Sequence, residues 1–303
     1  MYFTLYYATD LFHGLMVKCV KPLFEELKKG GQVRYVFFYR SNFRGENLIL
    51  NLELSSDVGQ NEAEELKNKV LSHAEAFFEH HGVSSEEETN PYASLKLFKN
   101  RPKNTVEFEE LSNEEVDQYH HIEQHQIVAQ RVSEIVLELY ANFPNWGVES
   151  SMLSSIMMKL ACGFVYSQGE CLGVLTSFLN STYELVISFE NLESIEWAKQ
   201  TSARLFEERK EYLISFVGEK LGAMEGGRHG NAFEMQPWHQ LVGELYEYQK
   251  NQQQAGDKKT VASLLSFVDN QLGLDGPYVQ VVYLLLLKTL KSLEIRDYSQ
   301  KEN

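Results

Sequence analysis

Residues 32–54, QVRYVFFYRSNFRGENLILNLEL, contain two β-rich runs that flank the loop SNFRG. Valine, isoleucine, phenylalanine and tyrosine favour extended backbone, so QVRYVFFYR and ENLILNLEL predict the two strands of a β-hairpin. The first eight residues, MYFTLYYA, alternate and are rich in aromatic side chains, which predicts a further strand. The beginning of the chain therefore indicates a β-sheet.

Helical patterns lie on both sides of this hairpin. LFHGLMVKCVKPLFEELKK, residues 11–29, has helical spacing and stops at two glycines, and Pro22 begins or kinks its second half. Residues 61–82 predict a second helix that ends at Gly82. YASLKLF and NTVEFEEL then predict two more strands around the turn KNRPKN, residues 99–104. Up to about residue 110 the predicted order is β-α-β-β-α-β-β.

The rest of the chain reads as helical. Ser112 and Glu115 form a capping-box pattern that opens a long helix to residue 143. Further helices are predicted at about 150–166, 191–222, 235–253, 258–273 and 276–293. We therefore predict an α+β fold with an N-terminal mixed β-sheet, flanking helices and a mainly helical C-terminal part. The prediction is one domain, 1–303, with a β-rich part at 1–110 and a mainly helical part at 111–303.

Composition excludes several classes of protein. The 303 residues carry a formal charge of −15, which argues against a general nucleic-acid binder because such proteins need a basic surface. Cys19, Cys162 and Cys171 show no CxxC spacing, so the cysteines indicate a reducing compartment without disulfides or a zinc knuckle. No signal peptide is predicted, and the longest apolar run is too short to span a membrane. We expect a soluble cytoplasmic protein.

HHIEQH, residues 120–125, suggests a metal site at first sight. His121 and His125 share a helix face, but Glu123 lies about 200° around the helix from His121 and does not form an HExxH motif. No third ligand is placed by spacing, so we expect no metal. A solvated histidine face, or single histidines that transfer protons, fits better.

Motifs for nucleophiles and phosphates are also missing. Ser154, Ser155 and Ser266 lack a GxSxG elbow, and the glycine-rich loop GAMEGGRHGNAF lacks the strand that a phosphate loop follows. The basic turn formed by Lys99, Arg101 and Lys103 stands out in an acidic chain. It is either a charged turn or a docking site for an acidic peptide.

Three stretches, in order, resemble one family: the C-terminal elimination domain of lantibiotic dehydratases and the free-standing thiopeptide enzymes that share its fold. VFFYRSNFRGENLILNLEL resembles the family's FFIRY-D-P-x-x-HLRLR hairpin, with Arg40 matching and Asn47, Ile49 and Asn51 in place of His, Arg and Arg. TVEFEELSNEEVDQYHH resembles the TYEPE…ERYGG stretch, with Gln118 in place of an arginine. SSMLSSIMMKLACGF also resembles a helix between the second and third motifs.

The third motif, SLLSFVDNQLG at residues 263–273, resembles the family's SLLHMHxNRLxG. Ser266 and Val268 stand where the family has histidines, Gln271 stands where it has arginine, and Asn270 matches. Arginines suit a glutamyl carboxylate and histidine suits its proton transfer, whereas serine, asparagine and glutamine suit amides. Ordinary glutamate elimination is therefore not expected.

The branch that lacks these groups is the thiopeptide pyridine synthases. The resemblance implies a precursor peptide with thiazoles and two dehydroalanines, which the enzyme joins by a formal aza-cycloaddition before water and the leader peptide are lost. It implies no metal and no organic cofactor. The expected partners are this leader-bearing peptide and other biosynthetic enzymes or a second copy of the chain, with no nucleic acid and no membrane.

Candidate site residues follow from the same comparison. We expect Ser266 and Asn270, one helical turn apart, to orient the reacting amide. Proton transfer falls to a group of four adjacent candidates, of which one or two can face a pocket: Asp117, Tyr119, His120 and His121. Substrate contacts are expected from the hairpin, the helices and the basic turn, namely Arg40, Gln118, Asp269, Gln271, Lys99, Arg101 and Lys103. For Arg40 a surface salt bridge is the alternative, and for Asn270 a bond to nearby backbone.

Two other functions remain open from the sequence. One is the glutamate-eliminating component of a split Ser/Thr dehydratase. The other is a scaffold that binds the leader peptide without catalysis.

Overall fold

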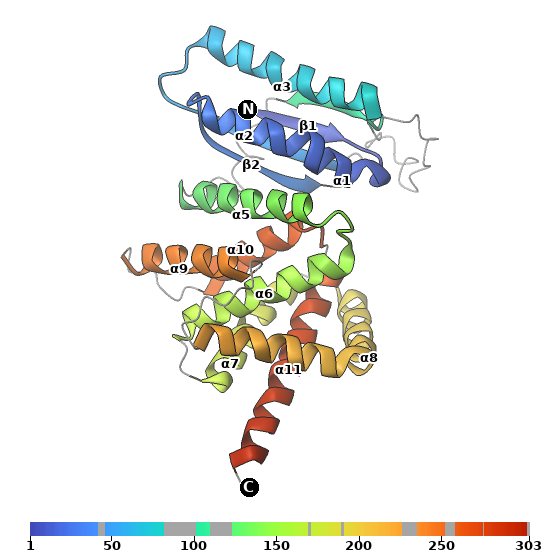
Figure 1. Cartoon of the computed structure of the whole chain (residues 1–303), viewed down its shortest axis with the longest axis vertical. Helices are drawn as coiled ribbons and strands as arrows, with labels where there is room; N and C mark the ends of the chain where they lie inside the picture. The colour runs from blue at the N-terminus through green and yellow to red at the C-terminus, as the bar shows by residue number, and fades with distance from the viewer. Residues whose placement is uncertain are drawn as a thin grey trace. The chain divides into compact units, whose positions relative to one another are not determined.

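The chain was analysed as a computed structural model that describes residues 1–41, 46–81, 101–109, 123–168, 171–188, 191–225, 235–251, 258–274 and 276–301. It folds as two compact units, Met1–Trp146 and Gly147–Asn303 (Figure 1). The first unit extends to Trp146, because helix α5 (Glu123–Asn142) packs on its strand β2 (Val33–Ser41). A single domain over the whole chain stays a prediction.

The first unit contains a four-stranded sheet of order β2-β3-β1-β4, where β1 is Tyr2–Tyr6, β3 is Asn47–Leu54 and β4 is Thr105–Glu109. The predicted hairpin is confirmed as β2 and β3, and the α+β class is confirmed with it. The described pairings are antiparallel, so the sheet is not mixed as predicted. β1 and β2 run in the same direction, but β3 lies between them, so these two strands do not pair with each other. The strand predicted at 92–98 lies outside the described residues.

The two faces of this sheet differ in chemistry. Phe3, Leu5, Leu48 and Leu50 lie on one face and are fully buried, with Phe108 of β4 beside Phe3 at a ring distance of 5.3 Å. The residues between them point to the opposite face, named the polar face here: Tyr2, Thr4, Tyr6, Phe37, Tyr39, Ser41, Asn47, Ile49, Asn51, Thr105 and Glu107. One face of the sheet is therefore apolar, while the polar face carries phenols, amides and hydroxyls together with Phe37, Ile49 and Glu107.

A continuous helical segment connects β1 to β2. It comprises a short 3₁₀ turn η1 (Thr9–Leu11), α1 (Phe12–Gly14), a widened stretch η2 (Leu15–Val20) and α2 (Lys21–Lys29). In η2 the Lys21 N–H bonds to the carbonyl of Met16, five residues back. Pro22 follows directly, and because proline lacks an N–H and its ring crowds the preceding turn, a widened turn accommodates it. The predicted irregularity at Pro22 is thereby explained.

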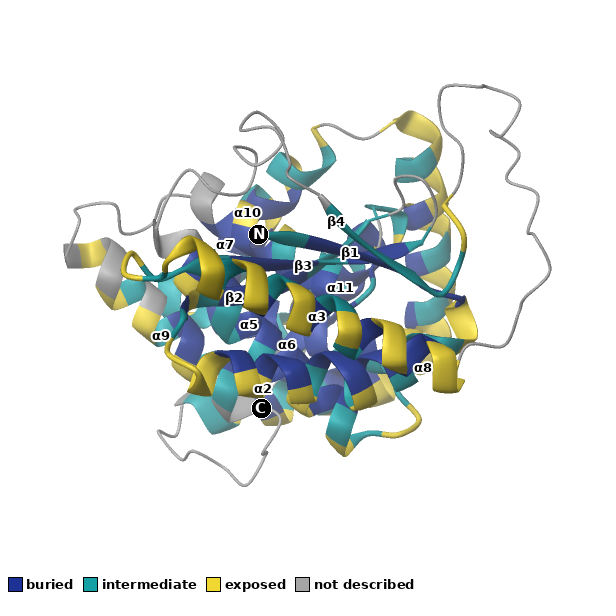
Figure 2. Ribbon diagram, turned by 90° about the horizontal axis from the view of Figure 1, so that it is seen from above, coloured by how far each residue is buried: buried dark blue, intermediate teal, exposed yellow. Residues whose placement is uncertain are grey.

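The remaining helices of this unit pack against the same sheet. α3 (Gln60–His81) packs on β4 and β1, with the Lys67 ammonium 4.7 Å from the Phe108 ring centre. Its outer side is exposed and its inner side buried (Figure 2). α2 ends at the predicted glycines, where Gly31 adopts a positive φ of 69°.

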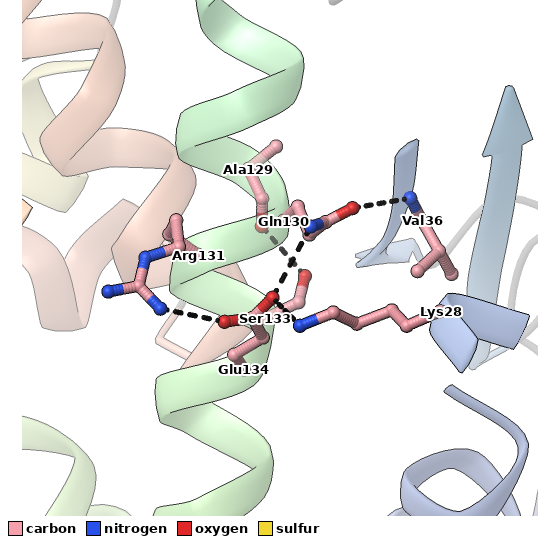
Figure 3. A network of polar contacts seen from close by, with 7 residues as sticks. All are labelled: Lys28, Val36, Ala129, Gln130, Arg131, Ser133 and Glu134. Atoms are coloured by element: carbon pink, nitrogen blue, oxygen red, sulfur yellow. Dashed lines mark hydrogen bonds and ion pairs between the residues drawn. The ribbon is translucent and has the colours of Figure 1, made fainter. Parts of the chain in front are cut away.

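Helix α5 covers the outer edge of strand β2. The backbone N–H of Val36 donates to Gln130 Oε1 at 3.0 Å, and that of Phe38 donates to Ser133 Oγ at 3.2 Å. Glu134, one turn further along α5, receives Lys28 from α2 and Arg131 from its own helix (Figure 3). An edge strand leaves donors without ladder partners, so these side chains satisfy two of them and seal the edge.

The second unit consists of helices in its described part: α6 (Val148–Tyr166), α7 (Leu172–Ile187), α8 (Leu192–Glu225), α9 (Met235–Asn251), α10 (Lys258–Gln271) and α11 (Gly276–Lys301). Five of them match predicted helices. α7 was not predicted, although Leu175, Phe178, Leu179 and Thr182 have helical spacing and are buried. Its β-branched residues lower its helix propensity. Packing on α10 and α11 supplies the stability that this propensity lacks.

α6 is the central helix of this unit and packs on all five of the others. It approaches α7 closely at Gly163, where an added Cβ would lie 3.2 Å from the Leu179 side chain. By length and composition α6 alone among the described helices passes as a membrane span, but 61% of that window is buried inside the protein. We therefore assign α6 as the core helix of this unit.

Candidate functional site

The third sequence motif forms most of α10 and its C-terminal end. The N–H of Leu274 donates to Asp269 O at 2.8 Å and the N–H of Gly273 to Asn270 O at 3.0 Å, which together make a Schellman motif. Gly273 has a φ of 81°, a backbone conformation that glycine adopts without strain. The glycine at position 273 is thus explained by the end of α10, which requires a left-handed backbone there.

One face of α10 reaches the surface. Ser263 and Ser266 are exposed and Asn270 is half-exposed, at the i, i+3 and i+7 spacing of one helix face. This set is called the α10 face below. The structure therefore places Ser266 and Asn270 together, as predicted, on a surface that a substrate can reach. Their catalytic role stays a prediction.

Asp269 and Gln271, both predicted to touch substrate, point the other way. Asp269 is 1% exposed and Gln271 0% exposed. Val268, which stands at a histidine position of the family motif, is buried as well. Of the three positions of this motif that hold histidine or arginine in the family, Ser266 is the accessible one.

Asp269 is the centre of a buried polar cluster between α10 and α6. The Lys159 ammonium lies 2.8 Å from Oδ1 and 2.7 Å from Oδ2 of Asp269, and it also bonds to Ser155 Oγ at 2.7 Å. Ser155 donates its own hydroxyl to Asp269 Oδ1 at 2.5 Å. One turn earlier on α6, Ser151 Oγ bonds to Leu272 O at 2.6 Å. The cluster ties α6 to α10 at two levels.

Burial dominates the electrostatics of this cluster. It lowers the pKa of Lys159, and the negative charge of Asp269 opposes that shift. Tyr283 of α11 lies with its ring 4.6 Å from the Lys159 ammonium, and burial raises its pKa well above the ordinary value. Burial likewise raises the pKa of the Cys162 thiol to about 12, which makes it a poor nucleophile.

The polar face of the sheet holds the strand that matches the family's HLRLR segment. Asn47 and Asn51 are buried and Ile49 half-buried. Tyr2 is hydrogen-bonded to Asn51, and burial raises the pKa of its phenol to about 12. These groups are neutral at physiological pH, so they suit amide and hydroxyl partners better than carboxylates.

Arg40 lies on the opposite face of the sheet. Its guanidinium stands 4.5 Å from the centre of the Phe12 ring and bonds to the phenol of Tyr7. Burial raises the pKa of Tyr7, while the positive charge of Arg40 acts against that shift. His13 Nε2 contacts the carbonyl of Tyr140 at 3.1 Å in the same cluster. Arg40 is thus held by aromatic and phenolic groups rather than on the face that carries Asn47 and Asn51.

Several predicted residues lie outside the described part of the chain: Lys99, Asp117, Gln118, Tyr119, His120 and His121. In the basic turn, Arg101 pairs with Glu107 of β4 at 3.2 Å and Lys103 is half-exposed. Within the described residues, no group of three or more His, Cys, Asp or Glu side chains is placed to hold a metal ion.

Sequence reasoning missed Lys159 as a structural partner. The sequence does indicate a polar stripe on one face of this mainly apolar helix, because Ser151, Ser155 and Lys159 recur every four residues. What the sequence lacks is the identity of the facing side chain, 110 residues further along.

A model of the lantibiotic biosynthesis dehydratase C-terminal family matches residues 1–290. The chain belongs to this family. The resemblance that the three motifs indicated is therefore confirmed. No protein of curated function matches the sequence significantly.

Solved structures of the family share the fold. The pyridine synthase TbtD from thiomuracin biosynthesis gives a TM-score of 0.73 at 13% identity over 96% of this chain and 97% of that one. TsrL gives 0.62 at 10% identity, covering 97% of this chain and 95% of its own. The tRNA-dependent lantibiotic dehydratase MibB from Microbispora sp. 107891 gives 0.52 at 13% identity over 97% of this chain, but over only 28% of its own length. The chain thus shares the fold of these structures.

Proposed function

We propose that this protein is a cytoplasmic pyridine synthase that closes a macrocycle in a thiazole-bearing precursor peptide. The observation that carries the proposal is the α10 face. Of the motif positions that hold histidine or arginine in the family, Val268 and Gln271 are buried here, and the accessible one holds Ser266 beside Asn270. Neither side chain is an acid–base catalyst or a carboxylate ligand of the kind that glutamate elimination needs.

The proposed chemistry uses neutral donors. One dehydroalanine reacts through the iminol form of its neighbouring amide, and two carbon–carbon bonds to the second dehydroalanine close a six-membered nitrogen ring. Loss of water and of the leader peptide as an amide makes that ring aromatic. Ser266 and Asn270 suit the iminol oxygen because a hydroxyl and an amide donate hydrogen bonds without attracting stray anions.

Most of the acceleration in such a reaction comes from bringing two distant alkenes together. Well-oriented intramolecular reactions gain on the order of 7–11 kcal/mol from positioning. Proton transfer is assigned to the group Asp117, Tyr119, His120 and His121, and leader contacts to the basic turn.

The experiment combines the purified protein with a leader-bearing thiazolyl peptide that carries two dehydroalanines. Mass spectrometry should show a cyclised product that has lost water and the leader, together with the leader as a free amide. If the protein leaves this peptide unchanged but releases glutamate from a glutamyl-Ser peptide, it is an eliminating component instead. Leader binding without conversion of either peptide would make it a scaffold.

A further inference from the structure

Ser266 and Asn270 on the α10 face keep a fixed orientation only if α10 cannot rotate about its own axis. Apolar packing restrains that rotation weakly, because Leu265, Val268 and Leu272 are aliphatic and can pack in neighbouring arrangements. The Lys159–Asp269 pair is more restrictive, since both carboxylate oxygens lie at hydrogen-bond distance from one ammonium. Asn270 follows Asp269 by one residue, about 100° around the helix, so fixing Asp269 fixes where Asn270 emerges.

Burial makes this restraint strong. Lys159 and Asp269 each have about 1% of their side chain exposed, so neither charge has water as an alternative partner. A rotated α10 would leave both charges buried and apart, which is strongly unfavourable. Ser151 holds the C-terminal end of the same helix at Leu272, so the helix is also restrained against sliding.

We infer that Lys159, Asp269 and Ser155 act as positioning residues, which set the rotation of α10 and hence the direction of Ser266 and Asn270. The inference rests on the proposed function for its catalytic consequence. Its structural part, the orientation of the α10 face, is measurable without any substrate.

The test replaces both charges by apolar groups of similar volume, Lys159→Met with Asp269→Leu. Removing a buried ion pair as a whole leaves stability roughly unchanged, so this double variant should fold. The matched control is Lys28→Met with Glu134→Gln, which removes an interhelical ion pair in the first unit and changes no residue of α10. Orientation is read in two ways: hydrogen exchange of the α10 amides, and maleimide labelling of Ser266→Cys in a Cys171→Ser background.

In the double variant we expect α10 exchange to rise by about tenfold or more, labelling at position 266 to change by about threefold or more, and the melting temperature to stay unchanged or rise. Peptide conversion should fall by about tenfold or more, chiefly in kcat, because the reacting groups are misdirected. The control should match the parent protein in α10 exchange and labelling.

Two results would overturn the inference. One is a double variant whose α10 exchange and labelling equal those of the parent. The other is exchange that rises evenly over α6 to α11, since this marks a loss of stability rather than of orientation. If the parent protein does not convert the peptide, the proposed function fails, while exchange and labelling still decide the positioning role.

Discussion

Ser266 and Asn270 present a hydroxyl and an amide on an accessible helix face, and the proposed function assigns them to the reacting amide of the peptide. We predict that Ser266→Ala or Asn270→Ala lowers kcat for peptide conversion on the order of 10²-fold, the usual consequence of losing one donor to a developing oxyanion. The melting temperature should change little for Ser266→Ala, because that side chain is exposed.

The matched controls are Ser177→Ala and Asn180→Ala on α7, which remove the same two groups from an exposed face of another helix. Both should keep the parent rate. Equal rates for all four variants would remove the α10 face from the active site.

Gly273 gives a second expectation at the same scale. Its φ of 81° lies in the left-handed region, where a Cβ is strained, so Gly273→Ala should lower the free energy of unfolding by about 1 kcal/mol. Gly222→Ala in helix α8 is the control, since a Cβ there meets nothing within 4 Å and the change should stabilise. Urea unfolding measures both, and a loss at Gly222 equal to that at Gly273 would contradict the explanation.

The direction of individual side chains was only partly predictable from the sequence. The four-residue interval put Ser266 and Asn270 on one face, and the structure agrees. Asp269 and Gln271 were predicted to contact substrate because they belong to the third family motif. Both are buried, and the partner that makes burial of Asp269 tolerable, Lys159, comes from a distant helix that no local pattern identifies.

At the scale of elements, the seal between α5 and β2 carries a prediction. Gln130→Ala combined with Ser133→Ala leaves the N–H groups of Val36 and Phe38 without their present acceptors. We expect a loss of about 1–3 kcal/mol for each buried donor and faster hydrogen exchange at those two amides.

Arg131→Ala is the control on the same helix, because its guanidinium pairs with Glu134 and not with the strand. It should alter stability by less than about 0.5 kcal/mol. A double variant as stable as this control would mean that water replaces the two side-chain acceptors at no cost.

Elements with a strong periodic pattern were predicted correctly, and weaker ones were not. The hairpin β2–β3 and the helix that ends at Gly31 follow from residue type and turn chemistry alone. The pairing of β1 with β3 and β4 depends on contacts between distant segments, so the antiparallel character of the sheet was not evident. α7 was missed for a related reason, since its stability comes from packing against α10 and α11.

At the scale of the molecule, buried phenols predict how stability depends on pH. Burial raises the pKa of Tyr7, Tyr140 and Tyr283 above the ordinary value of 10. Above that pH the unfolded chain has lost these protons while the folded protein retains them. The stabilisation is therefore complete below pH 10 and is lost as pH rises toward the folded pKa values.

We predict that Tyr140→Phe shows a smaller fall in the free energy of unfolding between about pH 10 and about pH 11 than the parent protein does. Tyr212→Phe on α8, where the side chain is exposed, should leave the fall unchanged. Chemical denaturation across this range is the measurement. If the free energy of unfolding fell equally with pH in Tyr140→Phe and in the parent, this phenol would ionise equally in the folded and unfolded states.

The division of the chain was the least predictable feature at this scale. The sequence predicted one domain whose pattern changes from β-rich to mainly helical near residue 110. In the structure helix α5 belongs to the unit of the sheet, because it supplies acceptors to β2. Such a dependence of one segment on another lies in the pairing of specific donors and acceptors, and hydropathy does not record it.

The ion pair inside the second unit has an evolutionary consequence. Losing either Lys159 or Asp269 alone leaves a lone buried charge, while losing both together is tolerable. Substitutions at positions 159 and 269 should therefore occur together during the evolution of the family. A sequence with only one of the two charges should be rare. A lineage that carries an aliphatic residue at position 159 is expected to carry an uncharged residue at 269. In such a lineage other contacts would have to orient the α10 face.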